Sequence, residues 1–286
     1  MNYRKEDLSR MVSSLLILHD ETAKFLNKHN LEPTLNSQAD KELASFRKES
    51  VETAYSQGNL LIEASADHLI ALHRSLTEPI LTIAPFTSAR AILESSALAS
   101  WLFDPLIVVN ERVKRSLSFR FEGLSQQVAF ARAARKDISK AVERIDDVEK
   151  LAISLGFSTI QDKNGKRIGI AQQFPKMTSL IGSMFNEEYI YRLLSAFIHG
   201  HPWAIHQLSF NQIKNSYSSN NRFIFEKGLK PEALIFICHK SAYAFSKPIW
   251  NRNKLYGYNL SDFAKILNSI FDNSTFVKTS RFWNKP

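Results

Sequence analysis

The spacing of hydrophobic positions predicts a protein built almost wholly from helices. Between residues 41 and 76, apolar or small side chains recur at steps of three and four, at Leu61, Ser65, Leu69, Leu72 and Leu76. The same rhythm continues through residues 110–136, at Val113, Leu117, Phe121, Leu124, Val128 and Ala131. Steps of this size place side chains on one face of an α-helix, so each stretch predicts one long amphipathic helix.

Shorter stretches with the same pattern predict further helices. They cover residues 4–29, 87–103 and 137–156, begin again near 178 and 187, and return at 231–250 and 261–271. Glycine and asparagine break the pattern at 158–175, which predicts a loop or short hairpin, and residues 215–222 read as a polar loop. The expected fold class is all-α, a helical bundle with N- and C-terminal helical additions.

Three segments follow from these patterns. Residues 1–45 would form an N-terminal helix and linker, residues 46–210 the helical bundle, and residues 211–286 a basic, aromatic-rich helical region. No internal repeat of solenoid period is present.

Positive charge is concentrated near the C-terminal end of the sequence. The formal net charge of the chain is +9, and residues 211–286 hold twelve Lys/Arg and four Asp/Glu, a difference of +8. Basic residues among aromatic ones can hold phosphates and stack bases, which makes Arg252 and Lys254 candidates for RNA binding. A solvated basic surface over an aromatic core explains the same composition equally well.

A second basic stretch lies in the helix expected at 110–136. Between Arg112 and Lys136 there are seven basic residues and one acid, Glu122. Arg112 and Arg115 are therefore also candidates for RNA binding, and a solvated helix face is the competing interpretation.

Composition and motifs limit where the protein can be expected in the cell and which kinds of site it can carry. Cys238 is the one cysteine, so no internal disulfide can form, and a cytoplasmic protein without a membrane segment is expected. The start of the sequence does not resemble a signal peptide. No phosphate-binding, dinucleotide-binding or nucleophile-elbow motif is present, and we expect neither a metal nor a cofactor. The histidines at 199, 201 and 206 are a weak metal candidate, because no cysteine or aspartate lies nearby.

The stretch NEEYIYRLLSAFIHGHPWAIH, residues 186–206, carries the strongest functional signal. It reads as an apolar helix, yet Arg192 and His199 lie two turns apart on one face, because positions i and i+7 differ by about 20°. Ser195 lies between them, and Glu188 lies one turn before the arginine. A histidine can accept the proton of an RNA 2′-hydroxyl, and an arginine can stabilise the anionic transition state that follows.

The string RLLSAFIH resembles the motif of the HEPN superfamily, in which four to six residues separate an arginine from a histidine. With the preceding stretch SARAILESSALASWL, it is similar to HEPN proteins of the abortive-infection type, over roughly residues 51–204. The resemblance implies a helical bundle, metal-independent RNA cleavage and a homodimer in which two motifs line one cleft. The sequence departs from many active members at Leu193, where they carry Asn, Asp or His.

Glu94 is the remaining candidate. It shares the apolar stretch 87–103 with a single other charged residue, Arg90, one turn away. One interpretation is a structural ion pair between the two. The other is that Glu94 orients Arg192 or His199, as an acidic residue does in related HEPN folds.

The expected function is a metal-independent RNA endonuclease of toxin or phage-defence type, with catalytic residues Arg192, His199, Ser195 and Glu94. Its expected partners are RNA, a second copy of the chain, and an antitoxin or defence-system protein. Two alternatives stay open: a non-catalytic HEPN-like module that binds a nucleotide or a partner protein, and a purely structural helical scaffold.

Overall fold

The structure, a computed structural model, describes residues 5–29, 32–208, 210–217, 223–227 and 230–271. Within these ranges the chain forms eleven helices and two antiparallel hairpins, which confirms the all-α prediction. The first six helices are α1 (Lys5–Lys28), α2 (Gln38–Ser45), α3 (Lys48–Ser75), α4 (Ala84–Leu102), α5 (Val109–Ala133) and α6 (Ser139–Ser154). The later ones are α7 (Met177–Phe185), α8 (Glu188–Ile198), α9 (Pro202–Leu208), α10 (Pro231–Tyr256) and α11 (Leu260–Phe271). The hairpins pair β1 (Thr159–Gln161) with β2 (Arg167–Ile170), and β3 (Phe210–Tyr217) with β4 (Phe223–Lys227).

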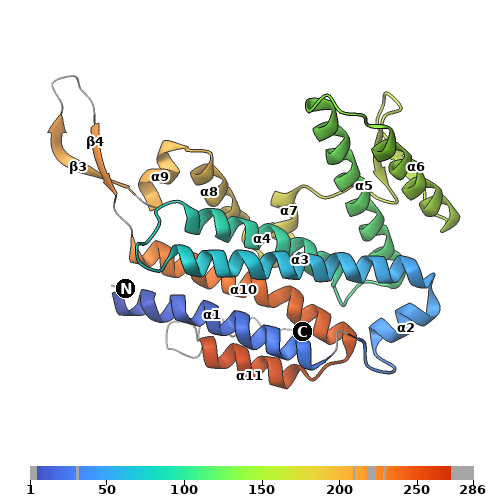
Figure 1. Ribbon diagram of the computed structural model, residues 1–286, viewed down its shortest axis with the longest axis horizontal. Coiled ribbons are helices and arrows are strands. Elements are labelled where there is room, and N and C mark those ends of the chain that lie inside the picture. The colour runs from blue at the N-terminus through green and yellow to red at the C-terminus, as the bar shows by residue number, and fades with distance from the viewer. Residues whose placement is uncertain (1–4, 30–31, 209, 218–222, 228–229, 272–286) are drawn as a thin grey trace.

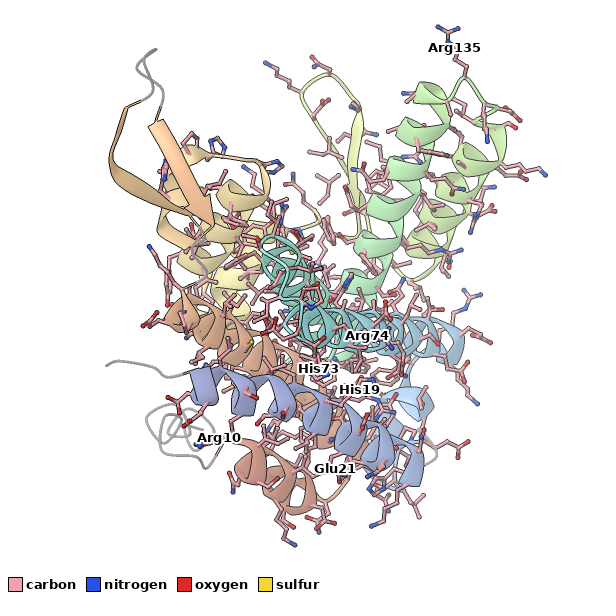
Figure 2. All side chains as sticks on the ribbon, turned by 60° about the vertical axis from the view of Figure 1, so that its left-hand side comes forward. Arg10, His19, Glu21, His73, Arg74 and Arg135 are labelled. Carbon is pink, nitrogen blue, oxygen red and sulfur yellow. The ribbon has the colours of Figure 1, made fainter. Side chains whose placement is uncertain are left out.

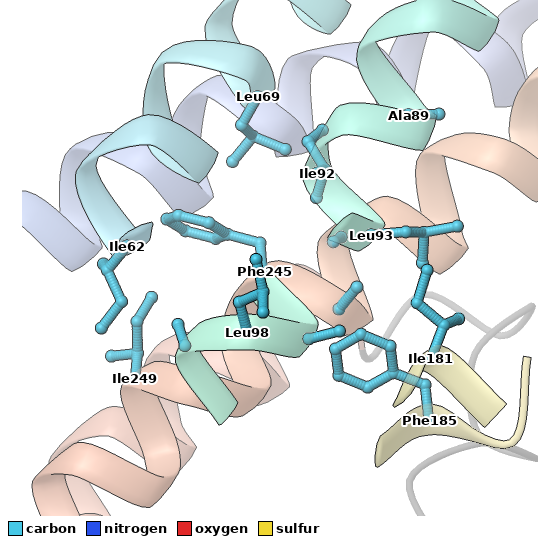
Figure 3. Close-up of a cluster of buried hydrophobic side chains, with 14 of the residues drawn as sticks. Ile62, Leu69, Ala89, Ile92, Leu93, Leu98, Ile181, Phe185, Phe245 and Ile249 are labelled. Atoms are coloured by element: carbon cyan, nitrogen blue, oxygen red, sulfur yellow. The ribbon is translucent and has the colours of Figure 1, made fainter. Parts of the chain in front are cut away.

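The core lies where α3, α4 and α10 run side by side, with α1 and α11 packed beneath them (Figure 1). The leucine stripe of α3 points into it, and Leu69 and Leu72 are fully buried. Figure 3 shows Ile62 and Leu69 of α3 meeting Ile92 of α4 and Phe245 of α10. Parts of all three segments expected from the sequence therefore share one hydrophobic core.

Small residues allow α3 and α4 to approach closely. The hydroxyls of Ser65 and Ser96 lie 2.7 Å apart across the interface, and both side chains are buried. At Gly58, a Cβ atom would overlap the ring of Phe103, which is fully buried at the end of α4. A side chain larger than hydrogen at position 58 would therefore force the two helices apart.

Three predictions of local structure have different outcomes. The expected helix over 41–76 is divided into α2 and α3, because Phe46 adopts an extended conformation between them. The break at 158–175 contains the β1–β2 hairpin, which confirms the hairpin alternative. The expected polar loop at 215–222 begins within β3, and its residues 218–222 lie outside the described ranges.

An arm formed by α5, α6 and the β1–β2 hairpin stands out from the body of the protein (Figure 1). Arg135 lies at the tip of this arm, where its side chain points away from the protein (Figure 2). The base of α5 is fixed to the body through Arg112, whose side chain is completely buried.

Candidate functional site

The stretch expected as one helix over 186–206 is interrupted after Ile198. Asn186 takes the left-handed conformation with φ 59°, which ends α7 and turns the chain into α8. His199 caps the C-terminal end of α8, and Gly200 follows with φ +74°, a conformation that glycine adopts without strain. Pro202 then begins α9. His199 therefore sits at a helix end, where its side chain is exposed.

The polar stripe of α8 faces solvent and its apolar side faces the core. Ile190, Leu194 and Phe197 are each at most 3% exposed, and Phe197 packs on Phe86 of α4 with 4.5 Å between ring centroids. Arg192 is 67% exposed and donates from Nε to Glu188 Oε1 at 2.8 Å. This ion pair with Glu188 is also what a purely structural role for Arg192 predicts, and it lies on the surface and not in the core.

Arg192, Ser195 and His199 follow one another at helical spacing along α8 and its C-cap, but no hydrogen bond joins their side chains within the described part of the chain. Ser195 is half-buried, and its backbone oxygen accepts from the backbone N–H of His199 at 3.0 Å. The exposed ion pair with Glu188 is weak, because water screens both charges and competes for their hydrogen bonds. Arg192 is therefore available to an anion such as a phosphate.

Glu94 forms the structural ion pair that was one of its two interpretations. Its Oε1 accepts from Arg90 Nε at 2.9 Å and from the Tyr191 hydroxyl at 2.9 Å. The Arg90 guanidinium also lies 5.3 Å from the centre of the Tyr191 ring. Burial, and then the bond to Glu94, raise the pKa of Tyr191. Glu94 thus binds Tyr191, the residue before Arg192. Within the described residues it makes no hydrogen bond to Arg192 or His199.

The two arginines of α5 predicted to bind RNA are structural residues. Arg112 is 0% exposed and binds both carboxylate oxygens of Glu42, with Nε–Oε2 at 2.8 Å and Nη2–Oε1 at 3.2 Å. Arg115 is 13% exposed and donates to the backbone oxygen of Trp101 at 2.7 Å and to Glu111 at 3.1 Å. Neither guanidinium has a free face for a phosphate, so the expectation is corrected for both.

Of the two C-terminal candidates, only Lys254 is exposed. Arg252 is 1% exposed, donates to Asn59 Oδ1 at 2.8 Å, and lies 4.4 Å from the ring centre of Tyr256. Arg252 is therefore buried against Tyr256 and is not presented to RNA, so the expectation for Arg252 is corrected too. The last basic and aromatic residues, from 272 onward, lie outside the described ranges.

In the described ranges, no group of three or more His, Cys, Asp or Glu side chains is placed to hold a metal ion, so the histidines at 199, 201 and 206 do not form such a cluster. None of the described helices is both long and apolar enough to cross a membrane.

A cavity of about 230 Å³ lies between the α7–α8 turn and α10, and sequence reasoning missed it. Its walls are formed by Phe185, Asn186, Glu187, Tyr189, His239, Lys240 and Tyr243. The available signal was the pair His239–Lys240 inside the otherwise apolar stretch ALIFICHKSAYAF. Polar side chains on a buried helix need partners, and here Lys240 pairs with Glu187.

Comparison of the chain with family models, with curated proteins and with solved structures gives no match.

Proposed function

We propose that the protein is a metal-independent endoribonuclease whose catalytic groups are Arg192 and His199. The observation that carries this proposal is their placement: both are exposed, Arg192 on the solvent side of α8 and His199 at its C-cap, while the opposite face of the helix is anchored in the core. A cation and an imidazole held on a rigid support can act together on one phosphodiester. The resemblance to the HEPN motif supports the same chemistry.

In this reaction the 2′-oxygen of one nucleotide attacks the adjacent phosphorus, and the 5′-oxygen of the next nucleotide leaves. His199 accepts the proton of the 2′-hydroxyl, and Arg192 binds the phosphate oxygens as their negative charge increases. Ser195, between them on the helix, donates a hydrogen bond to a phosphate oxygen. The products are a 2′,3′-cyclic phosphate and a free 5′-hydroxyl.

A dimer supplies the group that one copy lacks. The leaving 5′-oxygen needs a proton, and a single chain offers one histidine in the stripe. Two copies with their α8 helices facing each other would provide one histidine as base and the other as acid. The exposed position of the stripe is compatible with such an interface.

The test is cleavage of single-stranded RNA in excess EDTA. We expect cleavage, a cyclic phosphate end, and no reaction on DNA, which has no 2′-hydroxyl. His199→Ala and Arg192→Ala should each lower the rate by about 100–1,000-fold, with the melting temperature unchanged.

The matched controls are His201→Ala and Arg144→Ala, which remove an exposed histidine and an exposed arginine outside the stripe. Both should keep the full rate. A pure, folded protein that leaves RNA intact would refute the proposal and favour the non-catalytic module that Leu193 suggests.

A further inference from the structure

The cavity between the α7–α8 turn and α10 contains an ion pair that is largely shielded from water. Lys240 Nζ donates to Glu187 Oε1, and the two side chains are 19% and 9% exposed. The second carboxylate oxygen, Oε2, is buried and has no hydrogen-bond partner in the described part of the chain. A buried carboxylate oxygen without a donor destabilises the protein, and a ligand that supplies a donor would remove that cost.

The ion pair offers complementary hydrogen-bonding groups side by side. Lys240 has further N–H donors beyond the one used by Glu187, and Glu187 has an oxygen that needs a donor. A ligand edge that matches this pair has an acceptor next to one or two N–H donors. The Watson–Crick edge of guanine has this order, with O6 beside N1–H and the N2 amino group.

The remaining walls suit a flat aromatic ring. Phe185 and Tyr243 meet edge to face, with ring centroids 6.2 Å apart, and they close the inner side. Tyr189 is 60% exposed at the mouth of the cavity, and burial, and then the charge and hydrogen bonding of Glu187, raise the pKa of its hydroxyl, so its ring borders the carboxylate that a bound base would meet. Burial, and then the charge of Lys240, lower the pKa of His239 to about 4, so its imidazole is neutral near pH 7 and adds no positive charge to the wall.

The size of the cavity sets a limit on the ligand. Its volume of about 230 Å³ is below the roughly 300–1,000 Å³ typical of drug-sized ligand sites. A single base fits this space, with its sugar and phosphate outside the mouth.

We propose that this cavity binds the guanine base of a nucleotide, with Glu187 and Lys240 on its Watson–Crick edge and Tyr189 on its face. The site lies one helical turn before Arg192, because Tyr189 and Arg192 are three residues apart on α8. Binding here does not require cleavage, so it is measurable whether or not the protein cuts RNA.

Titration calorimetry on the full chain tests this site with three probes: 5′-GMP, 5′-AMP and ribose 5-phosphate. We expect GMP to bind about 10–100-fold more tightly than AMP, the range set by a bidentate contact to a base edge. Ribose 5-phosphate should not bind measurably. Two 2′-deoxy heptamers, TTTGTTT and TTTATTT, distinguish the source of the base. A heptamer that binds more tightly than GMP assigns the site to unpaired nucleic acid, and equal or weaker binding assigns it to free nucleotides.

Two variants test the assignment of residues, and one serves as control. Glu187→Gln replaces an acceptor with a donor and should weaken GMP binding by about 10–100-fold. Tyr189→Ala removes an exposed ring, leaves the fold intact, and should weaken GMP and AMP alike by about 10-fold. Glu232→Gln changes an exposed carboxylate on α10, the helix that carries Lys240, and should bind as the unmodified chain does.

Three results would each overturn the proposal: no saturation by millimolar GMP, equal affinity for GMP and ribose 5-phosphate, or unchanged affinity in both cavity variants. If Glu187→Gln lowers the melting temperature, the Tyr189→Ala result alone decides.

Discussion

Replacing Arg112 with methionine should lower the free energy of unfolding more than the same replacement of any exposed arginine. The side chain is completely buried and makes four hydrogen bonds: two to Glu42, and one each to the backbone oxygens of Leu102 and Asp104. Methionine fills much of the same space but leaves the Glu42 carboxylate without its cation. Breaking a buried ion pair from one side typically costs about 3–5 kcal/mol of unfolding free energy.

Glu42 keeps two donors after the replacement, which places the expected loss in the lower half of that range. The Tyr55 hydroxyl donates to its Oε2 at 2.6 Å, and Gln38 Nε2 donates to its Oε1 at 3.0 Å. Adding Glu42→Gln to the variant removes the uncompensated charge. The double variant should therefore recover at least about 1 kcal/mol relative to the sum of the two single losses.

Urea denaturation followed by far-ultraviolet circular dichroism measures these changes. The control is Arg132→Met, which removes an exposed arginine of the same helix and should change stability by no more than about 0.5 kcal/mol. Suppose instead that Arg112→Met loses less than about 1 kcal/mol and weakens RNA binding. This result would refute the buried ion pair of Arg112 with Glu42 and would support Arg112 as an RNA contact.

Three further predictions concern local packing and titration. Gly58→Ala should lower the unfolding free energy by about 1–3 kcal/mol, because the added Cβ would meet the Phe103 ring. Gly123→Ala should raise the unfolding free energy by about 0.5–1 kcal/mol, because the space around Gly123 is open. Thermal denaturation of both variants checks the opposite signs, and two losses of equal size would contradict them. Because the pKa of His239 is lowered to about 4, the unfolded state binds a proton that the folded state does not between pH 6.5 and 4. The unfolding free energy should therefore fall by up to about 3 kcal/mol as pH falls through this window, with a smaller fall in His239→Gln; equal pH profiles would refute this. Burial raises the pKa of the Cys238 thiol, so iodoacetamide at pH 8 should label the protein only after denaturation, as mass spectrometry would show, and rapid labelling of the folded protein would contradict its burial.

Helix positions were predictable because their signal is local. Leu69 and Leu72 of α3 lie on the stripe that sequence spacing indicated, and both are buried. The break between α2 and α3 was not predictable in the same way. Polar and apolar residues continue across it at helical spacing, and no proline or glycine marks the extended residue Phe46. The helical pattern alone therefore merged two elements into one.

Charge was the least reliable basis for predicting RNA contacts, because the sequence does not show whether a basic residue is buried or exposed. Arg112 is buried by Glu42, a partner 70 positions away in the sequence, and Arg252 by Asn59, 193 positions away. Neither partner could be identified from local spacing.

The stripe on α8 was predictable, since helical geometry alone places Arg192 and His199 on one face. The cavity beside it was not predictable, because Glu187 meets Lys240 across 53 positions. The end of α8 was missed, because residues 186–206 were interpreted as one helix, although Gly200 before Pro202 is a typical stop signal.

The central place of α10 has a consequence for how the chain is made. This helix, residues 231–256, packs against α1, α3 and α4, which are all synthesised well before it. Until α10 leaves the ribosome, the apolar faces of those earlier helices have no permanent cover. Nascent chains with such exposed surfaces aggregate or bind chaperones. Folding of the core should thus wait until residues 231–256 have been synthesised, and chains truncated before residue 231 should be degraded instead of accumulating as folded fragments.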